Sequence, residues 1–266
     1  MAQASQQPPA AFQESHLELE GLRLRYMEAS PPHPDGTVVM VDANIWGLSK
    51  LHHALAQKYR VVALELPAPA QIASRSVKDL AGIMNQAVTR LASEKYTLIG
   101  TSLGANVALW QTLQSPDQVE ALVLISPTAI LPSGGPAPTS PEEVAKRLFA
   151  HQEDLQEFSR DSGTVAGERG LVQRIMGTAH DGEAESKLGE IQCAALVVFG
   201  LQDKMVAPEA GGIFRENISN SNLSFVYDTG HIIVAERPEA LIDAVSDFVE
   251  RRETFVVGRQ SSIINP

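Results

Sequence analysis

The sequence predicts an α/β fold in which helices cover both faces of a mostly parallel sheet of about eight strands. Short apolar runs alternate with longer segments that carry apolar residues at helical spacing. Residues 96–110, YTLIGTSLGANVALW, have the composition of a strand, a tight turn and a helix in direct succession. The alternation resumes after residue 190. Runs that are apolar throughout are typical of strands buried on both faces, as in parallel sheets.

The first predicted elements lie at one edge of the sheet. Residues 16–20 and 22–26 alternate between apolar and polar side chains around Gly21, which predicts an antiparallel hairpin. Residues 1–14 are expected to be a disordered N-terminal segment, since the first 13 are polar and rich in Pro and Gln. The following strands are predicted at 37–41, 60–64, 96–99 and 119–125, and helices at 46–58, 77–91 and 105–110.

The alternation of strands and helices stops between residues 128 and 189. The segment opens with a Pro-, Gly- and Ser-rich stretch, and its amphipathic parts predict helices at 141–160 and 168–179. We interpret 128–189 as a helical insertion after the sixth strand, within a core of residues 15–127 and 190–252. Strands at 194–200 and 223–227 and helices at 208–217 and 237–252 complete that core. The tail, 253–266, is apolar enough to pack against it.

Bulk properties limit the classes of partner. The 266 residues suffice for one large domain. A net charge of −11 repels nucleic acid phosphates and anionic membrane surfaces, so neither is an expected partner. The expected partner is a small-molecule substrate, and the chain is expected to be a monomer or homodimer. Met1 to Gln13 lack the features of a signal peptide, and no apolar stretch could span a membrane, so we expect a cytoplasmic protein. Cys193, the only cysteine, is expected to be a small core residue; no cofactor or metal site is expected.

Gly100-Thr101-Ser102-Leu103-Gly104 lies between a predicted strand and a predicted helix. This is the context in which G-x-S-x-G forms a nucleophile elbow, a turn so tight that side chains at its two ends would collide with neighbouring backbone. Taken alone, the pattern is weak and is better explained as a simple glycine turn between a strand and a helix. The presence of a base and an acid elsewhere in the chain therefore decides the interpretation of Ser102.

Of the seven histidines, His231 is the best candidate base. It follows a predicted strand and precedes a helix, so it lies at the carboxyl end of the sheet, where ligands bind in open parallel sheets. Asp203 follows the strand at 194–200 in the same way. The other histidines are interpreted as surface residues: His16, His33, His52, His53, His151 and His180. The order Ser102, Asp203, His231 is the chain order associated with α/β-hydrolases.

On these residues the sequence resembles the α/β-hydrolase fold superfamily. The likeness runs from about residue 16 to residue 252 and includes GTSLG, FGLQDKMVAP and DTGHIIVAERPEALIDAVSDFV. It implies that Ser102 is the nucleophile, His231 the general base and then acid, and Asp203 the carboxylate that orients the histidine. The insertion takes the place of the family's cap domain.

The resemblance also implies an oxyanion hole made of backbone N–H groups, here from Leu103 and Asn44. After the strand at 37–41 this chain has Asp42-Ala43-Asn44, where the family usually has His-Gly and one further residue. Asn44 takes the position of that further residue, and its carboxamide is a second possible donor.

The expected function is that of a cofactor-free serine hydrolase acting on a small carboxylic ester, lactone or thioester. A perhydrolase or a C–C bond hydrolase with the same triad is an alternative within enzymes. A non-catalytic, hydrolase-like ligand-binding protein is the alternative from another class, because a fold does not fix a function.

Overall fold

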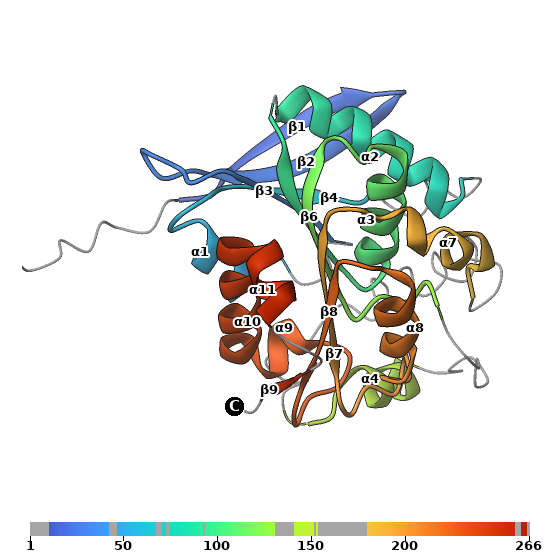
Figure 1. Cartoon of the computed structure of the whole chain (residues 1–266). Coiled ribbons are helices and arrows are strands. Elements are labelled where there is room, and N and C mark those ends of the chain that lie inside the picture. Colours follow the sequence, from blue (N-terminus) through green and yellow to red (C-terminus); the bar gives the residue numbers. More distant parts are fainter. Residues whose placement is uncertain are drawn as a thin grey trace, which may run out of the picture.

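The computed structural model describes residues 11–42, 47–67, 71–72, 75–92, 94–130, 141–151, 153, 180–258 and 262–264. Nine strands form one sheet in the order β1-β2-β4-β3-β5-β6-β7-β8-β9 (Figure 1). Their bounds are β1 Gln13–Leu19, β2 Leu22–Ala29, β3 Thr37–Asp42, β4 Arg60–Glu65, β5 Tyr96–Thr101, β6 Val119–Ile125, β7 Ala194–Gly200, β8 Ser221–Val226 and β9 Ser262–Ile264. The predicted fold class is confirmed.

The helices lie in two layers, one on each face of the sheet (Figure 1). On one face lie α2 Val77–Leu91, α3 Leu103–Gln114, α7 Gly182–Ser186 and α8 Ala210–Asn217, with the 3₁₀ turn Leu188–Glu190. On the other lie α1 Lys50–Leu55, α9 Ile233–Glu236, α10 Pro238–Arg251 and α11 Glu253–Gly258. A further helix, α4 Pro141–Leu148, comes from the predicted insertion.

The central strands are apolar throughout because each contributes to two separate cores. In β3, Val39 and Val41 pack with α2 and α3, whereas Val38 and Met40 pack with α1 and α10. The strands from β4 to β9 along the sheet pair in parallel, whereas β1 pairs with β2, and β2 with β4, in the antiparallel sense. Parallel pairing brings the carboxyl ends of these strands to one edge of the sheet, where the loops after β5, β7 and β8 meet.

Several boundaries differ from the sequence prediction. β1 begins at Gln13, two residues inside the segment expected to be disordered, because Gln13 and Glu14 pair with Glu28 and Met27. The tail provides α11 and the ninth strand, and Phe255 packs edge-on against Phe248 with ring centroids 5.5 Å apart. The predicted insertion helix at 168–179 lies outside the described residues.

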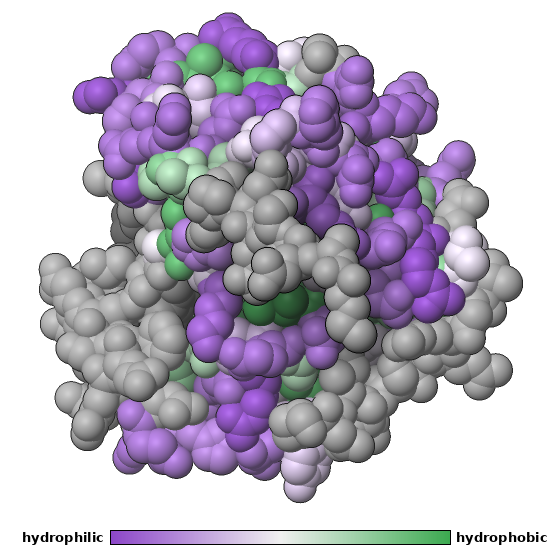
Figure 2. Space-filling view, turned by 90° about the vertical axis from the view of Figure 1, so that its left-hand side faces the viewer, coloured by the Kyte–Doolittle hydropathy of each residue, from purple (hydrophilic) through white to green (hydrophobic). Residues whose placement is uncertain are grey.

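Polar side chains cover most of the described surface on the face shown in Figure 2, and its apolar areas are small. Among the described residues, Tyr227 is the one large hydrophobic side chain that is exposed. No helix in the described part of the chain is both long and apolar enough to cross a membrane. Cys193 is half-buried directly before β7, and burial raises its thiol pKa to about 11, so the thiol is protonated at neutral pH.

Candidate active site

Ser102 joins β5 to α3 in a strained backbone conformation. Its φ is 54° and its ψ is −117°, a region that non-glycine residues rarely adopt and that costs about 1–3 kcal/mol. The Ser102 amide donates to the carbonyl of Ile125 at 2.9 Å, and its own carbonyl accepts from Ala105 at 3.0 Å. These contacts with β6 and α3 hold the serine at the carboxyl edge of the sheet. Strand, turn and helix follow one another as the G-x-S-x-G pattern predicts.

The two glycines of the pattern are required by close backbone contacts. A Cβ on Gly100 would lie 2.4 Å from the carbonyl oxygen of Gly104. A Cβ on Gly104 would lie 2.1 Å from the carbonyl oxygen of Val41, at the end of β3. Glycine therefore allows the first turn of α3 to pack directly against the end of a neighbouring strand.

Gly104→Ala is expected to lower the free energy of unfolding by about 3 kcal/mol or more. The added methyl group would collide with backbone atoms of β3, which cannot move aside as a flexible side chain can. Gly212→Ala is the matched control. It lies in α8 with no atom within 4 Å of an added Cβ, and should raise stability by about 0.5–1 kcal/mol. Urea denaturation of both variants measures the difference. Equal stability of the two would show that the elbow tolerates a side chain at residue 104.

His231 connects Ser102 to Asp203 through two hydrogen bonds. Its Nε2 lies 2.9 Å from the Ser102 Oγ, and its Nδ1 lies 2.8 Å from the Asp203 Oδ2. Because a carboxylate only accepts, Nδ1 carries the proton, and Nε2 is the acceptor for the hydrogen bond from the serine hydroxyl. The side chains of His231 and Asp203 are 1% and 0% exposed, which removes both from competing water.

Asp203 is held by the loop that follows β7. Its second oxygen, Oδ1, accepts from the amides of Met205 and Val206 at 2.8 and 2.9 Å. The buried carboxylate is thus hydrogen-bonded at both oxygens, which offsets the cost of removing it from water. The structure brings the three residues proposed from the sequence into one hydrogen-bonded chain.

Asp228 lies two residues beyond the end of β8 and close to His231 in sequence, but its side chain contacts other residues. It accepts from His151, with the His151 Nε2 2.9 Å from its Oδ1, and it forms an ion pair with Arg237. The hydrogen bond from the Arg237 guanidinium lowers the pKa of Asp228. Partial burial acts in the opposite direction, and His151 lowers the pKa further. This geometry agrees with the choice of Asp203 as the partner of His231.

The His151–Asp228 contact makes a pH-dependent contribution to stability. Burial lowers the pKa of His151, but the hydrogen bond and charge of Asp228 outweigh this effect and raise it above the ordinary value of 6.5. Arg237 opposes protonation, and Glu236 and Glu153 favour it. A raised pKa in the folded state means stabilisation that is complete below about pH 6.5 and is lost as the pH rises through the folded-state value.

His151→Asn is therefore expected to destabilise the protein more at pH 5.5 than at pH 9, since asparagine cannot be protonated. The measurement is the free energy of unfolding in urea for both proteins at each pH. A difference between variant and wild type that is the same at both values would contradict the assignment.

The predicted oxyanion donors are only partly described. Leu103 is the first residue of α3, and the first amides of a helix have no acceptor within the helix. Its N–H is therefore suitable for an anion beside Ser102. Asn44 lies outside the described residues.

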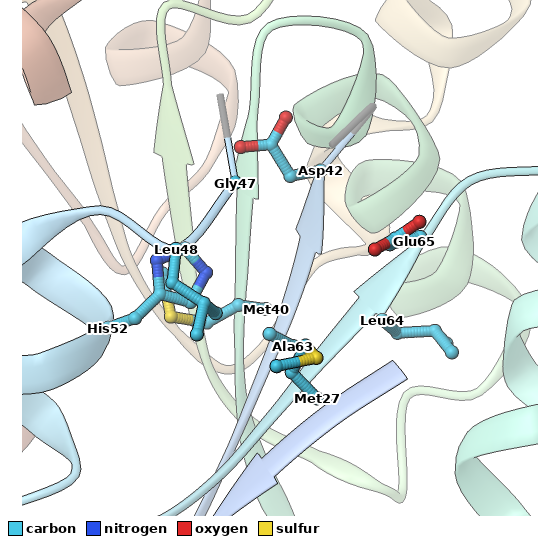
Figure 3. A pocket seen from close by; sticks show the side chains of 9 residues that line it. All are labelled: Met27, Met40, Asp42, Gly47, Leu48, His52, Ala63, Leu64 and Glu65. Carbon is cyan, nitrogen blue, oxygen red and sulfur yellow. The ribbon is translucent and has the colours of Figure 1, made fainter. Parts of the chain in front are cut away.

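His52 was predicted to be a surface residue, and this prediction is wrong. His52 lies in α1, and only 4% of it is exposed. Burial lowers its pKa to about 4, so the ring is neutral at physiological pH, and its Nδ1 accepts from the Ser49 amide at 3.0 Å. Figure 3 shows that His52 lines a pocket together with Met27 and Met40, with Asp42 and Glu65 at the ends of their strands. Helical periodicity did not indicate this burial, because it depends on how α1 packs.

Ser126 is a further residue near the site that sequence reasoning missed. It follows β6 with a φ of 47°, is fully buried, and donates from its hydroxyl to the carbonyl of His231 at 3.0 Å. The one sequence signal was its position at the carboxyl end of a central strand. Among the described residues, no group of three or more His, Cys, Asp or Glu side chains is arranged to bind a metal ion.

The profile of the alpha/beta hydrolase family matches residues 36–244. The chain belongs to the alpha/beta hydrolase family. The resemblance drawn from GTSLG and the segments around Asp203 and His231 is thereby confirmed, and so is the expected enzyme class.

Named relatives are distant but extend over most of the chain. A 2-hydroxy-6-oxononadienedioate/2-hydroxy-6-oxononatrienedioate hydrolase from Klebsiella pneumoniae is 28% identical, in an alignment that covers 73% of this chain and 77% of that hydrolase. A pimeloyl-(acyl-carrier protein) methyl ester esterase from Neisseria meningitidis is 23% identical over 82% of this chain and 95% of its own. A serine hydrolase of known structure from Cycloclasticus zankles has a TM-score of 0.71 and 17% identity, and covers 90% of this chain and 98% of that one. At this identity the structural likeness concerns the fold alone.

Proposed function

We propose that this α/β-hydrolase is a cofactor-free serine hydrolase that cleaves a small carboxylic ester, lactone or thioester. The observation that carries the proposal is the hydrogen-bonded chain from the Ser102 Oγ through His231 to the buried Asp203. A serine hydroxyl is a weak nucleophile unless a neighbouring base accepts its proton. His231 is positioned to do so, and Asp203 stabilises the imidazolium that forms.

The proposed reaction proceeds in two halves. The Ser102 Oγ attacks the substrate carbonyl carbon while its proton moves to the His231 Nε2, and the oxyanion accepts hydrogen bonds from the Leu103 amide and a second donor, proposed as Asn44. The tetrahedral intermediate collapses, and the leaving alcohol or thiol takes the proton from His231. Water then attacks the acyl group on Ser102 with His231 again as base, which releases the acid and restores the serine.

Hydrolysis of a carbon–carbon bond beside a ketone is the second candidate. It is favoured by the relative from Klebsiella pneumoniae, whose named substrates are 6-oxo acids. The relative from Neisseria meningitidis, a methyl ester esterase, favours the first candidate. Both reactions begin at a carbonyl carbon, so only tests with different substrates can distinguish the two candidates.

The experiment measures turnover of a panel of substrates and, in parallel, covalent labelling of the protein. The panel contains short- and long-chain p-nitrophenyl esters, lactones, acyl thioesters and one 2-hydroxy-6-oxodienoate. We expect turnover of at least one ester, lactone or thioester and labelling by a fluorophosphonate probe. Turnover of the oxodienoate alone would select the second candidate. A protein that turns over none of these compounds and is not labelled would contradict the proposal and favour a ligand-binding role.

A further inference from the structure

The backbone around His231 is fixed by residues that are distant in the sequence. The His231 amide donates to the Leu148 carbonyl at 2.8 Å, and its carbonyl accepts from Ser126. Gly230 packs so closely that an added Cβ would lie 2.8 Å from both the Leu148 oxygen and the Ala150 nitrogen. The position of the imidazole therefore depends on the segment Leu148–His151, which begins at the last residue of α4.

Glu236 joins this segment to the histidine loop. Its carboxylate Oε2 accepts from the Thr229 hydroxyl at 3.0 Å and from the Gly230 amide at 2.7 Å. Its Oε1 accepts from the amides of Ala150 and His151, both at 2.8 Å. One oxygen thus binds the residues just before His231, and the other binds the residues just after Leu148.

The chemistry of this site requires a carboxylate. Glu236 is 5% exposed, and a buried carboxylate is tolerated where donors satisfy it. Four donors converge on two oxygens, and hydrogen bonds to an ionised acceptor are stronger than those between neutral groups. Glutamine has the same shape, but its NH₂ group would face two of the donors, so one half of the bridge would be lost in either orientation.

We infer that Glu236 is a positioning residue for His231. It acts through the Gly230 amide and Thr229 on one side and through the segment Leu148–His151 on the other, and it does not contact the reacting atoms. The Ser102–His231 geometry then depends on that segment. The inference rests on the proposed function for its kinetic consequence, because misplacing a catalytic group by about 1 Å can cost about 10²-fold in rate.

The test compares Glu236→Gln with wild type and with Glu239→Gln as the matched control. Glu239 lies three residues further along, its side chain is 72% exposed, and it contacts Lys50. For Glu236→Gln we expect kcat and the rate of fluorophosphonate labelling to fall together by about 10- to 100-fold, with little change in KM. Glu239→Gln should retain wild-type values. Unfolding in urea shows what fraction of each variant is folded during the assay.

A second readout separates this inference from the proposed function. The proton shared by the His231 Nδ1 and Asp203 should give a far-downfield NMR resonance in wild type, whether or not a substrate is known. In Glu236→Gln that resonance should broaden or shift, and in Glu239→Gln it should not. A wild-type protein that shows the resonance but hydrolyses nothing would contradict the proposed function, and the effect of Glu236→Gln on the resonance would still decide the inference.

Three results would overturn the inference. The first is an unchanged resonance, and the second is an unchanged kcat. The third is a loss of activity that only follows the fraction of unfolded protein. If Glu236→Gln does not fold, Thr229→Val removes a single donor from Oε2 with little change of shape. In Thr229→Val we then expect smaller decreases in kcat and labelling rate and a smaller change of the resonance. If both kcat and the resonance of Thr229→Val equal those of wild type, the inference is also overturned.

Discussion

Ser102→Ala is expected to lose hydrolysis by a factor of about 10⁴ to 10⁶ and to lose all labelling by a fluorophosphonate probe. The variant lacks the oxygen that we propose attacks the carbonyl, so the residual rate should come from substrate binding and the oxyanion donors. The fold should persist, because the strained turn is also held by the Ser102 amide and carbonyl, which alanine retains.

The measurement is turnover of the best substrate from the panel, together with mass spectrometry of the labelled protein. Ser30→Ala, at an exposed loop position, is the control and should behave as wild type. Labelling that persists in Ser102→Ala would show that another residue is the nucleophile.

Asp203→Asn is expected to lower kcat by about 10⁴-fold. The asparagine NH₂ would face the Nδ1–H of His231, so the ring would be driven to the tautomer in which Nε2 carries the proton. Nε2 could then no longer accept the proton of Ser102. The side-chain oxygen of the asparagine can still accept the hydrogen bonds that the Met205 and Val206 amides donate to Asp203 Oδ1.

Asp228→Asn is the matched comparison, because it makes the same chemical change in a second aspartate close to His231 in sequence. Asp228 contacts His151 and Arg237, so this variant should lose stability while keeping activity close to that of wild type. A large loss of turnover in Asp228→Asn, with Asp203→Asn nearly normal, would reverse the assignment of the orienting carboxylate.

Local sequence patterns were sufficient for most of the sheet. The bounds of β6, β7 and α2 agree with the predicted ranges, since a strand buried on both faces must be apolar throughout and a helix covering a sheet must be apolar on one side. The candidate site was found for a related reason. Ser102, Asp203 and His231 each follow a strand, and in a parallel sheet those ends come together whatever the sequence distance between them.

Only the tertiary structure decided the contacts that support the site. Glu236 lies in a short helix beside apolar residues, and nothing in the local pattern shows that Ala150 and His151 donate to it from about 85 residues away. His52 was predicted to be exposed, and packing buried it. Asp203 was chosen from the sequence as the partner of His231, and the structure adds that the nearby Asp228 contacts His151 and Arg237 instead. Periodicity reports which side of an element is apolar, whereas a hydrogen bond between distant segments depends on where every intervening element packs.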